Sequence, residues 1–434
     1  MATQFSEAEN PHWGRTFYPI WAGQALSLIG SRLVSFALVW YLTTTTGSAT
    51  ILTTVSLVGM LPEMVLAPFA GALVDRWNRK KVMLVADTSI ALFTLLLAGL
   101  FAMGLIEVWH IFVLMFLRSI GGAFHYPAMS ASTSLMVPRE KLTKVQGLNQ
   151  VLGSVLTIIA APLGALALEL MEVGHVLFID VATALLAIIP LLFVHIPQPD
   201  IHTTQEEKAT PVRTMLRDVR EGLHYVVGWK GLFTILMAAT ILNALLNPAF
   251  SLLPLLVKNY FHLEVTALAS IETTLGIGML VGSLVLSAWG GFKRKMYTSL
   301  VGLVGLGIAA LLIGFAPENW FWMAIAGAAL FGLSNPITNG PLFAVLQETI
   351  DPTMQGRVFS LIGTASMAAS PIGLALAGPI SDKLGVQTWF IVGGVYCLLM
   401  VLLLAFNHSV RDLDLGNPNV GKKQPIIQPA TVSE

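Results

Sequence analysis

Long apolar runs separated by short polar or Gly/Pro-containing breaks make up most of the chain. A helix needs about 20 apolar residues to cross a hydrocarbon core about 30 Å thick. Unpaired backbone groups are not tolerated in lipid, and barrel strands would be about half as long and would alternate polar with apolar residues. The pattern therefore predicts an all-α membrane protein with twelve transmembrane spans, near residues 17–42, 49–74, 82–104, 109–133, 145–169, 174–195, 230–257, 265–290, 298–316, 319–346, 356–381 and 386–406.

Composition narrows the class further. Hydrophobic residues make up 55% of the chain and charged residues 11%, whereas a soluble domain usually carries about 25% charged residues. An ordinary soluble enzyme is therefore excluded. The net charge of zero gives no electrostatic support for a nucleic-acid partner. Cys397 is the only cysteine, so neither a disulfide framework nor a thiolate metal site is expected, and no cofactor is predicted.

The distribution of Lys and Arg predicts the orientation in the membrane. With a cytoplasmic N-terminus, 20 of the 24 basic residues fall on the cytoplasmic side, Lys258 and Lys383 fall outside, and Arg32 and Arg118 lie within spans. Cytoplasmic loops of membrane proteins carry such an excess of positive charge. We therefore predict a multi-pass protein of the bacterial inner (plasma) membrane with both termini in the cytoplasm.

One long polar stretch divides the twelve spans six and six. Apolar residues between Val212 and Tyr225 within this stretch share a helical face. This pattern predicts an amphipathic helix, lying either at the membrane surface with its arginines toward anionic headgroups or in solvent as a linker. The predicted parts are a cytoplasmic tail (1–16), an N-terminal six-helix bundle (17–195), a cytoplasmic linker (196–229), a C-terminal six-helix bundle (230–406) and a second cytoplasmic tail (407–434).

Spacings that recur in the two halves indicate an internal repeat. Such a repeat predicts two pseudo-symmetric halves with a substrate site between them near the middle of the membrane. The matching intervals are Pro127 to Pro138 with Pro341 to Pro352, and Gly147 to Pro162 with Gly356 to Pro371.

The segment from Gly71 to Lys81 carries the most specific motif. It resembles the signature between helices two and three of the major facilitator superfamily, with Asn78 where a glycine is usual. The resemblance implies the major facilitator fold, and a latch that closes the cytoplasmic side against the start of helix eleven, near residues 355–357. A basic loop that only follows the charge rule would not explain Gly71 and Asp75 at this spacing. The latch residues that the resemblance implies are Gly71, Asp75, Arg76, Arg79 and Lys80.

Arg118 resembles the helix-four arginine of the drug/proton antiporters in this superfamily. A charge inside a span is costly unless it is paired, so an intramembrane ionisable group is a functional candidate. Burial disfavours an ionised carboxylate and a nearby arginine favours it, so a paired glutamate could exchange protons. We predict a proton-coupling charge network of Glu272, Glu63, Arg118 and Arg32, with Glu272 as the preferred carrier and Asp180 as a weaker partner. The alternatives are a structural ion pair and a glutamate that contacts a cationic substrate.

Residues 21–31, 356–360 and 371–373 look like the macrolide-efflux branch of the superfamily. This implies a secondary exporter of amphipathic small molecules, macrolide or multidrug in type, that confers antibiotic resistance through proton-coupled alternating access. Its partners would be the small amphipathic substrate, protons and membrane lipids. Siderophore exporters and lysophospholipid flippases share much of the pattern. A membrane enzyme or a channel is disfavoured, since the sequence has no catalytic cluster, no P-loop and no filter-like segment.

Polar and aromatic residues inside the spans are candidates for the substrate cavity. Each one alone is more often a helix-packing contact than a ligand contact. The polar candidates are Gln24, Ser27, Asn243, Asn247, Asn335 and Asn339, and the apolar candidates are Phe36, Phe124 and Phe250.

Overall fold

The computed structural model describes residues 13–74, 76–194, 196 and 211–407. These residues form helices and their connections without a strand, and twelve of the helices are long and apolar enough to span a membrane. The predicted all-α class with twelve transmembrane helices is therefore confirmed. Asp75, residues 1–12 and 408–434 of the two predicted tails, and residues 197–210 of the linker lie outside the described part.

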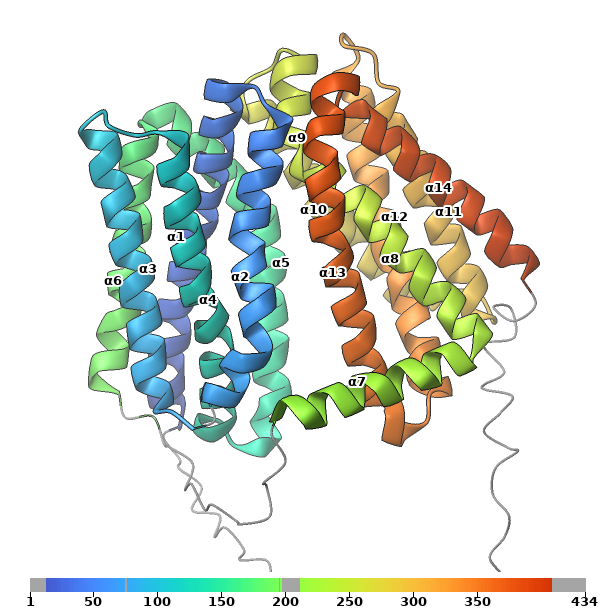
Figure 1. The fold of residues 1–434 in the computed structure, drawn as a ribbon, viewed down its shortest axis with the longest axis horizontal. Coiled ribbons are helices and arrows are strands. Elements are labelled where there is room, and N and C mark those ends of the chain that lie inside the picture. The colour runs from blue at the N-terminus through green and yellow to red at the C-terminus, as the bar shows by residue number, and fades with distance from the viewer. Residues whose placement is uncertain (1–12, 75, 195, 197–210, 408–434) are drawn as a thin grey trace, which may run out of the picture.

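The first six helices pack as one bundle (Figure 1). α1 lies against α5 and α6, α2 lies against α4, and α3 lies between α4 and α6. Small residues allow this close packing: a Cβ at Gly30 would lie only 2.9 Å from the Cα of Asp180. The helices are α1 (Trp13–Thr46), α2 (Ala49–Val74), α3 (Arg79–Ala102), α4 (Val108–Met136), α5 (Arg139–Leu170) and α6 (Val173–Phe193).

The second bundle is built in the same way around α10 and α12. A Cβ at Gly278 of α10 would lie 3.1 Å from the Cα of Gly332 in α12, so glycines set the distance between these two helices. The elements are α8 (Lys230–Ser251), α9 (Leu253–Leu255), the π-helix η1 (Leu256–Tyr260), α10 (Val265–Trp289), α11 (Lys295–Gly314), α12 (Phe321–Thr349), α13 (Pro352–Leu384) and α14 (Gln387–Phe406).

The seventh predicted span, 230–257, is wrong as a continuous helix. α8 ends at Ser251, and the chain continues through α9 and η1. Pro254 accounts for the break, because a proline inside a helix has no N–H to donate and its ring clashes with the carbonyl four residues earlier, here that of Phe250. The apolar composition that predicted the longer span carries no sign of this steric effect.

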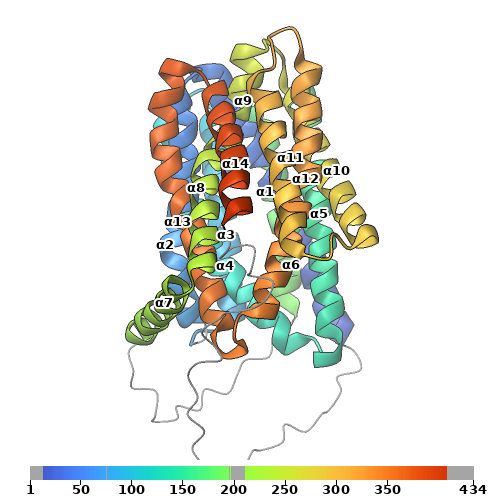
Figure 2. The same cartoon turned by 90° about the vertical axis from the view of Figure 1, so that its right-hand side faces the viewer.

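A further helix, α7 (Pro211–Gly228), forms within the linker where an amphipathic helix was predicted. α7 runs across one end of the molecule in Figure 1 and is seen obliquely at the same end in Figure 2, and it packs on α13 and α8. Its Glu221 forms an ion pair with Arg357 of α13, with 2.8 Å between Glu221 Oε2 and Arg357 Nη1. This pair joins the linker helix to the C-terminal bundle.

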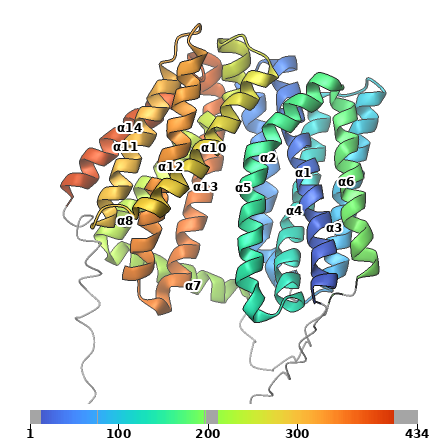
Figure 3. The ribbon, with the colours of Figure 1, turned by 180° about the vertical axis from the view of Figure 1, so that it is seen from behind.

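The hydrophobic cores show how the two bundles meet. Toward the end away from α7, one core contains residues of both bundles, such as Leu52 of α2 and Ala377 of α13. Toward the α7 end, each bundle has a core of its own. A Cβ at Gly71 of α2 or at Gly356 of α13 would meet no atom within 4 Å. The bundles are therefore closed against each other away from α7 and diverge toward α7 (Figure 3).

Candidate substrate cavity and charge network

A cavity of about 500 Å³ lies inside the C-terminal bundle. α8, α10 and α12 supply most of its wall, and α11 and α14 close its back. Thr157 of α5 also reaches it, so the N-terminal bundle contributes to the wall. Leucine, methionine and phenylalanine side chains dominate the lining. Size and lining are those of a small-molecule site, which is usually apolar with a few placed polar groups.

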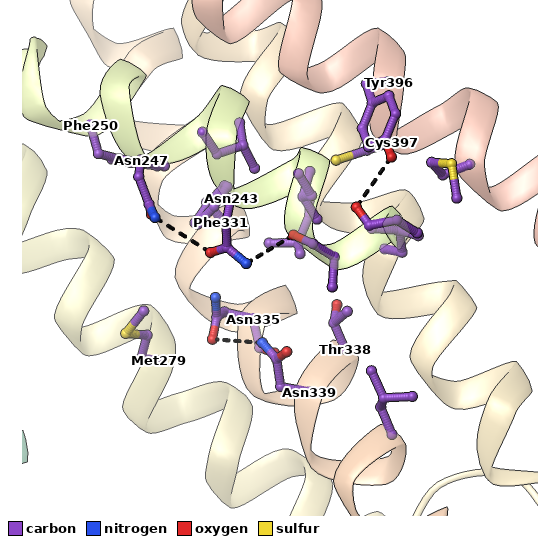
Figure 4. A pocket seen from close by; sticks show the side chains of 18 of the residues that line it. Asn243, Asn247, Phe250, Met279, Phe331, Asn335, Thr338, Asn339, Tyr396 and Cys397 are labelled. Carbon is purple, nitrogen blue, oxygen red and sulfur yellow. Dashed lines mark hydrogen bonds between the residues drawn. The ribbon is translucent and has the colours of Figure 1, made fainter. Parts of the chain in front are cut away.

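Two pairs of asparagines line this cavity (Figure 4). Asn243 and Asn247 lie one turn apart on α8, and Asn335 and Asn339 lie one turn apart on α12. Residues four apart share a helix face, so each pair presents both amides to the cavity. Asn339 Nδ2 donates to the carbonyl of Asn335 at 3.1 Å. Among the described residues, Asn335 Nδ2 has no hydrogen-bond partner, which leaves a donor for a ligand.

Glu272 of α10 lies on the wall of this cavity and is partly buried. Within the described parts of the chain, its carboxylate has neither an ion-pair partner nor a hydrogen-bond partner. A carboxylate in an apolar wall is expensive to ionise without a counter-charge. Glu272 is therefore placed either to take up a proton or to bind a cationic group of a ligand.

A second cavity, of about 610 Å³, lies between the bundles. Ser56 and Met60 of α2 line it on one side, and Ser366 and Ser370 of α13 line it on another. It shares Asn243, Asn247 and Phe250 of α8 with the first cavity. Asn247 Nδ2 donates to Ser370 Oγ at 2.7 Å, so this amide stands between the two spaces. Together the cavities run from the bundle interface into the C-terminal half.

The cavity candidates from the sequence divide into two groups. The first cavity brings together Asn243, Asn247, Phe250, Asn335 and Asn339, together with Glu272. The other four candidates lie in the N-terminal bundle and line neither cavity: Gln24 is buried, Ser27 and Phe36 lie on α1, and Phe124 stacks on Trp77 at 6.2 Å between ring centroids.

Arg118 pairs with Asp180, not with a glutamate. The Arg118 Nη1 to Asp180 Oδ2 distance is 2.7 Å, and the two side chains are 9% and 1% exposed. The predicted partners Glu63 and Glu272 are wrong, because Glu63 is exposed on α2 and Glu272 lies in the other bundle. Arg32 is exposed on α1. Within the described parts of the chain, no ion pair joins any two of the four residues that were predicted as one charge network.

Asp87 of α3 is a buried ionisable residue that the sequence analysis did not name as a candidate. Gln24 Nε2 donates to Asp87 Oδ2 at 2.7 Å, and His125 Nε2 lies 3.1 Å from Asp87 Oδ1. Asp87 is only 5% exposed. An aspartate alone in an apolar span is a functional candidate by the argument that selected Arg118, so the sequence did contain the signal.

The two buried clusters form successive polar layers. One layer contains Gln24, Asp87 and His125, and the other contains Ser31, Thr94 and Arg118 with Asp180. Each residue of the first layer lies seven positions from its counterpart in the second on α1, α3 or α4. Seven residues of helix are about 10 Å, so the layers lie about two turns apart. The N-terminal bundle therefore carries ionisable groups at two depths.

The profile of the Major Facilitator Superfamily matches residues 20–291 and 249–432. The chain belongs to the Major Facilitator Superfamily. The family predicted from the sequence is confirmed, and the chain is a transporter of the membrane and not an enzyme.

Several relatives of this facilitator match over most of its length. It is 36% identical over 404 residues to Macrolide efflux protein A of Streptococcus pyogenes, covering 93% of this chain and 98% of that protein. It is 25% identical to the multidrug efflux pump Tap of Mycolicibacterium fortuitum, covering 89% of this chain and 94% of the pump.

Solved structures of other transporters share the fold of this facilitator. A POT family transporter in complex with a thioalcohol conjugated peptide matches with a TM-score of 0.67 at 13% identity, over 91% of this chain and 95% of that one. The nucleoside transporter NupG matches with a TM-score of 0.64 at 12% identity, over 89% and 97%. At such identities the likeness concerns the fold alone.

Two basic residues of the predicted latch, Arg79 and Lys80, donate hydrogen bonds to carbonyls of the facilitator's own N-terminal half. Arg79 Nη1 donates to the carbonyl of Ala131 at 2.9 Å, and Lys80 Nζ donates to the carbonyls of Leu192 and Val194 at 2.9 Å. Arg76 is exposed. Since the bundles diverge at this end, a latch that closes against the start of α13 stays a prediction.

Proposed function

We propose that this facilitator is a secondary exporter of amphipathic small molecules, macrolide or multidrug in type, driven by proton entry through alternating access. The observation that carries the proposal is the apolar cavity with two asparagine pairs and the Glu272 carboxylate, which has no partner among the residues that the structure describes. Apolar walls suit the hydrophobic body of such a molecule, and the amides and Glu272 suit its hydroxyl and amine groups. The 36% identity to Macrolide efflux protein A supports this substrate class.

Alternating access is supported by the unequal packing of the two bundles. They share a core away from α7 and have separate cores toward α7. With both termini in the cytoplasm, this is the state that would load substrate from the inside. Export would require the shared core to open while the α7 end closes.

Proton coupling is supported by the carboxylate in the cavity. A transporter without a nucleotide-binding motif needs a group that can be protonated from each side in turn. Glu272 meets the geometric requirement, because it shares the cavity with the substrate groups. Entry of a proton from outside would neutralise Glu272 and favour release of a cationic substrate there.

Efflux from cells that carry the protein tests the proposal. We expect energised cells to expel macrolides and amphipathic dyes, and an agent that collapses the proton gradient should stop the expulsion. Movement of lysophospholipid that continues after the collapse would favour a flippase instead. Expulsion of siderophores with no effect on macrolides or dyes would favour the siderophore exporter.

A further inference from the structure

One carboxylate from the C-terminal bundle caps a helix of the N-terminal bundle. Asp382, near the end of α13, accepts hydrogen bonds from the backbone N–H groups of Ala49 and Thr50 at 2.7 and 3.2 Å. It also accepts from the hydroxyls of Thr50 at 2.6 Å and Ser48 at 3.3 Å. All four donors lie at the start of α2, at the end of the molecule away from α7.

These bonds satisfy groups that a helix start otherwise leaves unpaired. The first N–H groups of a helix have no partner within it, and its start carries a partial positive charge of about half a unit. Here Ser48 Oγ accepts from Ile51 N at 3.4 Å, and Asp382 accepts from Ala49 and Thr50. The helix and its capping carboxylate belong to different bundles, so the bundles cannot separate at this end without breaking the cap.

Close helix packing brings the carboxylate into place. Gly378 lies one turn before Asp382, and a Cβ on it would lie 2.6 Å from the Cα of Thr50. No side chain larger than hydrogen fits at that distance without a shift of the backbone. Gly378 therefore permits the contact between α2 and α13 that Asp382 then fastens.

The sequence around Asp382 repeats the pattern at the other end of α2. Gly378 is followed by Asp382 and Lys383, at the same intervals at which Gly71 is followed by Asp75 and Arg76. α2 begins at the end away from α7, whereas α13 finishes there, so the two helices are antiparallel (Figure 1). The same sequence spacing of a glycine, an aspartate and a basic residue therefore occurs where each of these two helices finishes.

We propose that Asp382 is a positioning residue of the transport cycle, which holds the end away from α7 closed by capping α2 and releases it when that end opens. The proposal rests on alternating access as proposed above. It gives the outer end its own latch, made by the same two helices that the cytoplasmic latch would use. The populations of the states that are open at one end or at the other would then depend on the relative strength of the two latches.

Spin-label distances test the proposal directly. Pairs of labels at the exposed positions 105 and 315 report opening of the end away from α7, in a Cys397→Ser background. Asp382→Asn keeps the size of the side chain but removes its charge, so we expect the open population at this end to rise about three- to tenfold. Thr50→Val removes one of the hydroxyl donors and should act in the same direction with a smaller effect. The double variant should have nearly the same open population as Asp382→Asn alone, because both substitutions act on the same contact.

The control is Glu318→Gln, which neutralises an exposed carboxylate in the connection between α11 and α12 at the same end. It should leave the distances unchanged. Equal distance distributions in the parent, Asp382→Asn and Thr50→Val proteins would overturn the latch. The distances are measured without substrate or a proton gradient. If the distances shift in Asp382→Asn but the parent protein transports no drug, the latch is kept and the exporter is rejected. If the parent protein shows gradient-driven efflux but the distances do not shift in Asp382→Asn, the exporter is kept and the latch is rejected.

Discussion

The guanidinium of Arg118 and the carboxylate of Asp180 form a 2.7 Å ion pair that joins α4 to α6. Thr94 of α3 donates to the same carboxylate oxygen at 2.9 Å, and Ser31 of α1 donates to the other oxygen at 2.9 Å. Four helices of the N-terminal bundle therefore meet at one buried carboxylate. The pair therefore links these four helices in the interior of the bundle.

Removal of Arg118 should destabilise the protein strongly. Arg118→Ala leaves Asp180 as an uncompensated buried charge, which costs about 3–5 kcal/mol. Thermal unfolding of the purified protein in detergent would show this as a lower midpoint. The control is Arg32→Ala, because Arg32 is exposed and should cost no more than about 0.5 kcal/mol. Equal midpoints for the two variants would contradict a structural role for the pair.

The apolar runs predicted the fold, since a lipid solvent permits only helices there. They could not predict which face of each helix turns inward. Asn243 and Asn247, one turn apart, line one cavity with Asn335 and Asn339, and their contact with substrate stays a prediction. The sequence named Asp180 as a weaker partner of Arg118 and could not rank it above Glu63, because the two acids differ in the direction that their helices face and not in residue chemistry.

Glu272→Gln should abolish uphill transport and keep downhill exchange. The amide imitates the protonated acid, so substrate can still bind while the proton has no site. Proteoliposomes with an imposed pH gradient separate the two activities. Glu63→Gln should pump as the parent does, because Glu63 is exposed outside the cavity.

Asp87→Asn provides the opposite test. If coupling runs through Glu272, this variant should retain gradient-driven accumulation, with lower stability because Asp87 is held by Gln24 and His125. Loss of accumulation in Asp87→Asn with full pumping in Glu272→Gln would move the proton site to the N-terminal bundle.

The asparagine pairs should determine substrate affinity. Asn335→Leu and Asn339→Leu each remove an amide from the cavity wall at similar side-chain size. A lost hydrogen bond of about 0.5–1.5 kcal/mol corresponds to a weakening of about two- to tenfold in substrate affinity. Dye binding followed by fluorescence measures it. Asn319→Leu, in an exposed connection, is the control and should bind as the parent does.

Asp75→Asn should shift the equilibrium in the direction opposite to Asp382→Asn. The carboxylate of Asp75 is predicted to favour closure of the α7 end against the start of α13, an effect of about 0.3–1 kcal/mol when exposed and up to about 2 when partly buried. Spin labels at the exposed positions 140 and 293 should then report a larger open population at that end. Transport should fall while folding is retained. Unchanged distances would show that Asp75 does not act as a latch.

The orientation decides which latch faces the cytoplasm, and an introduced cysteine can establish it. Arg220 is exposed on α7, and Glu318 is exposed at the opposite end. Because the sequence predicts 20 of the 24 basic residues on the cytoplasmic side, we expect a membrane-impermeant thiol reagent to label Glu318→Cys in intact cells, and to label Arg220→Cys only in inside-out vesicles. Both variants would carry Cys397→Ser. Labelling of Arg220→Cys in intact cells would reverse the topology, so that Asp382 would close the cytoplasmic end and the structure would be one that loads substrate from outside.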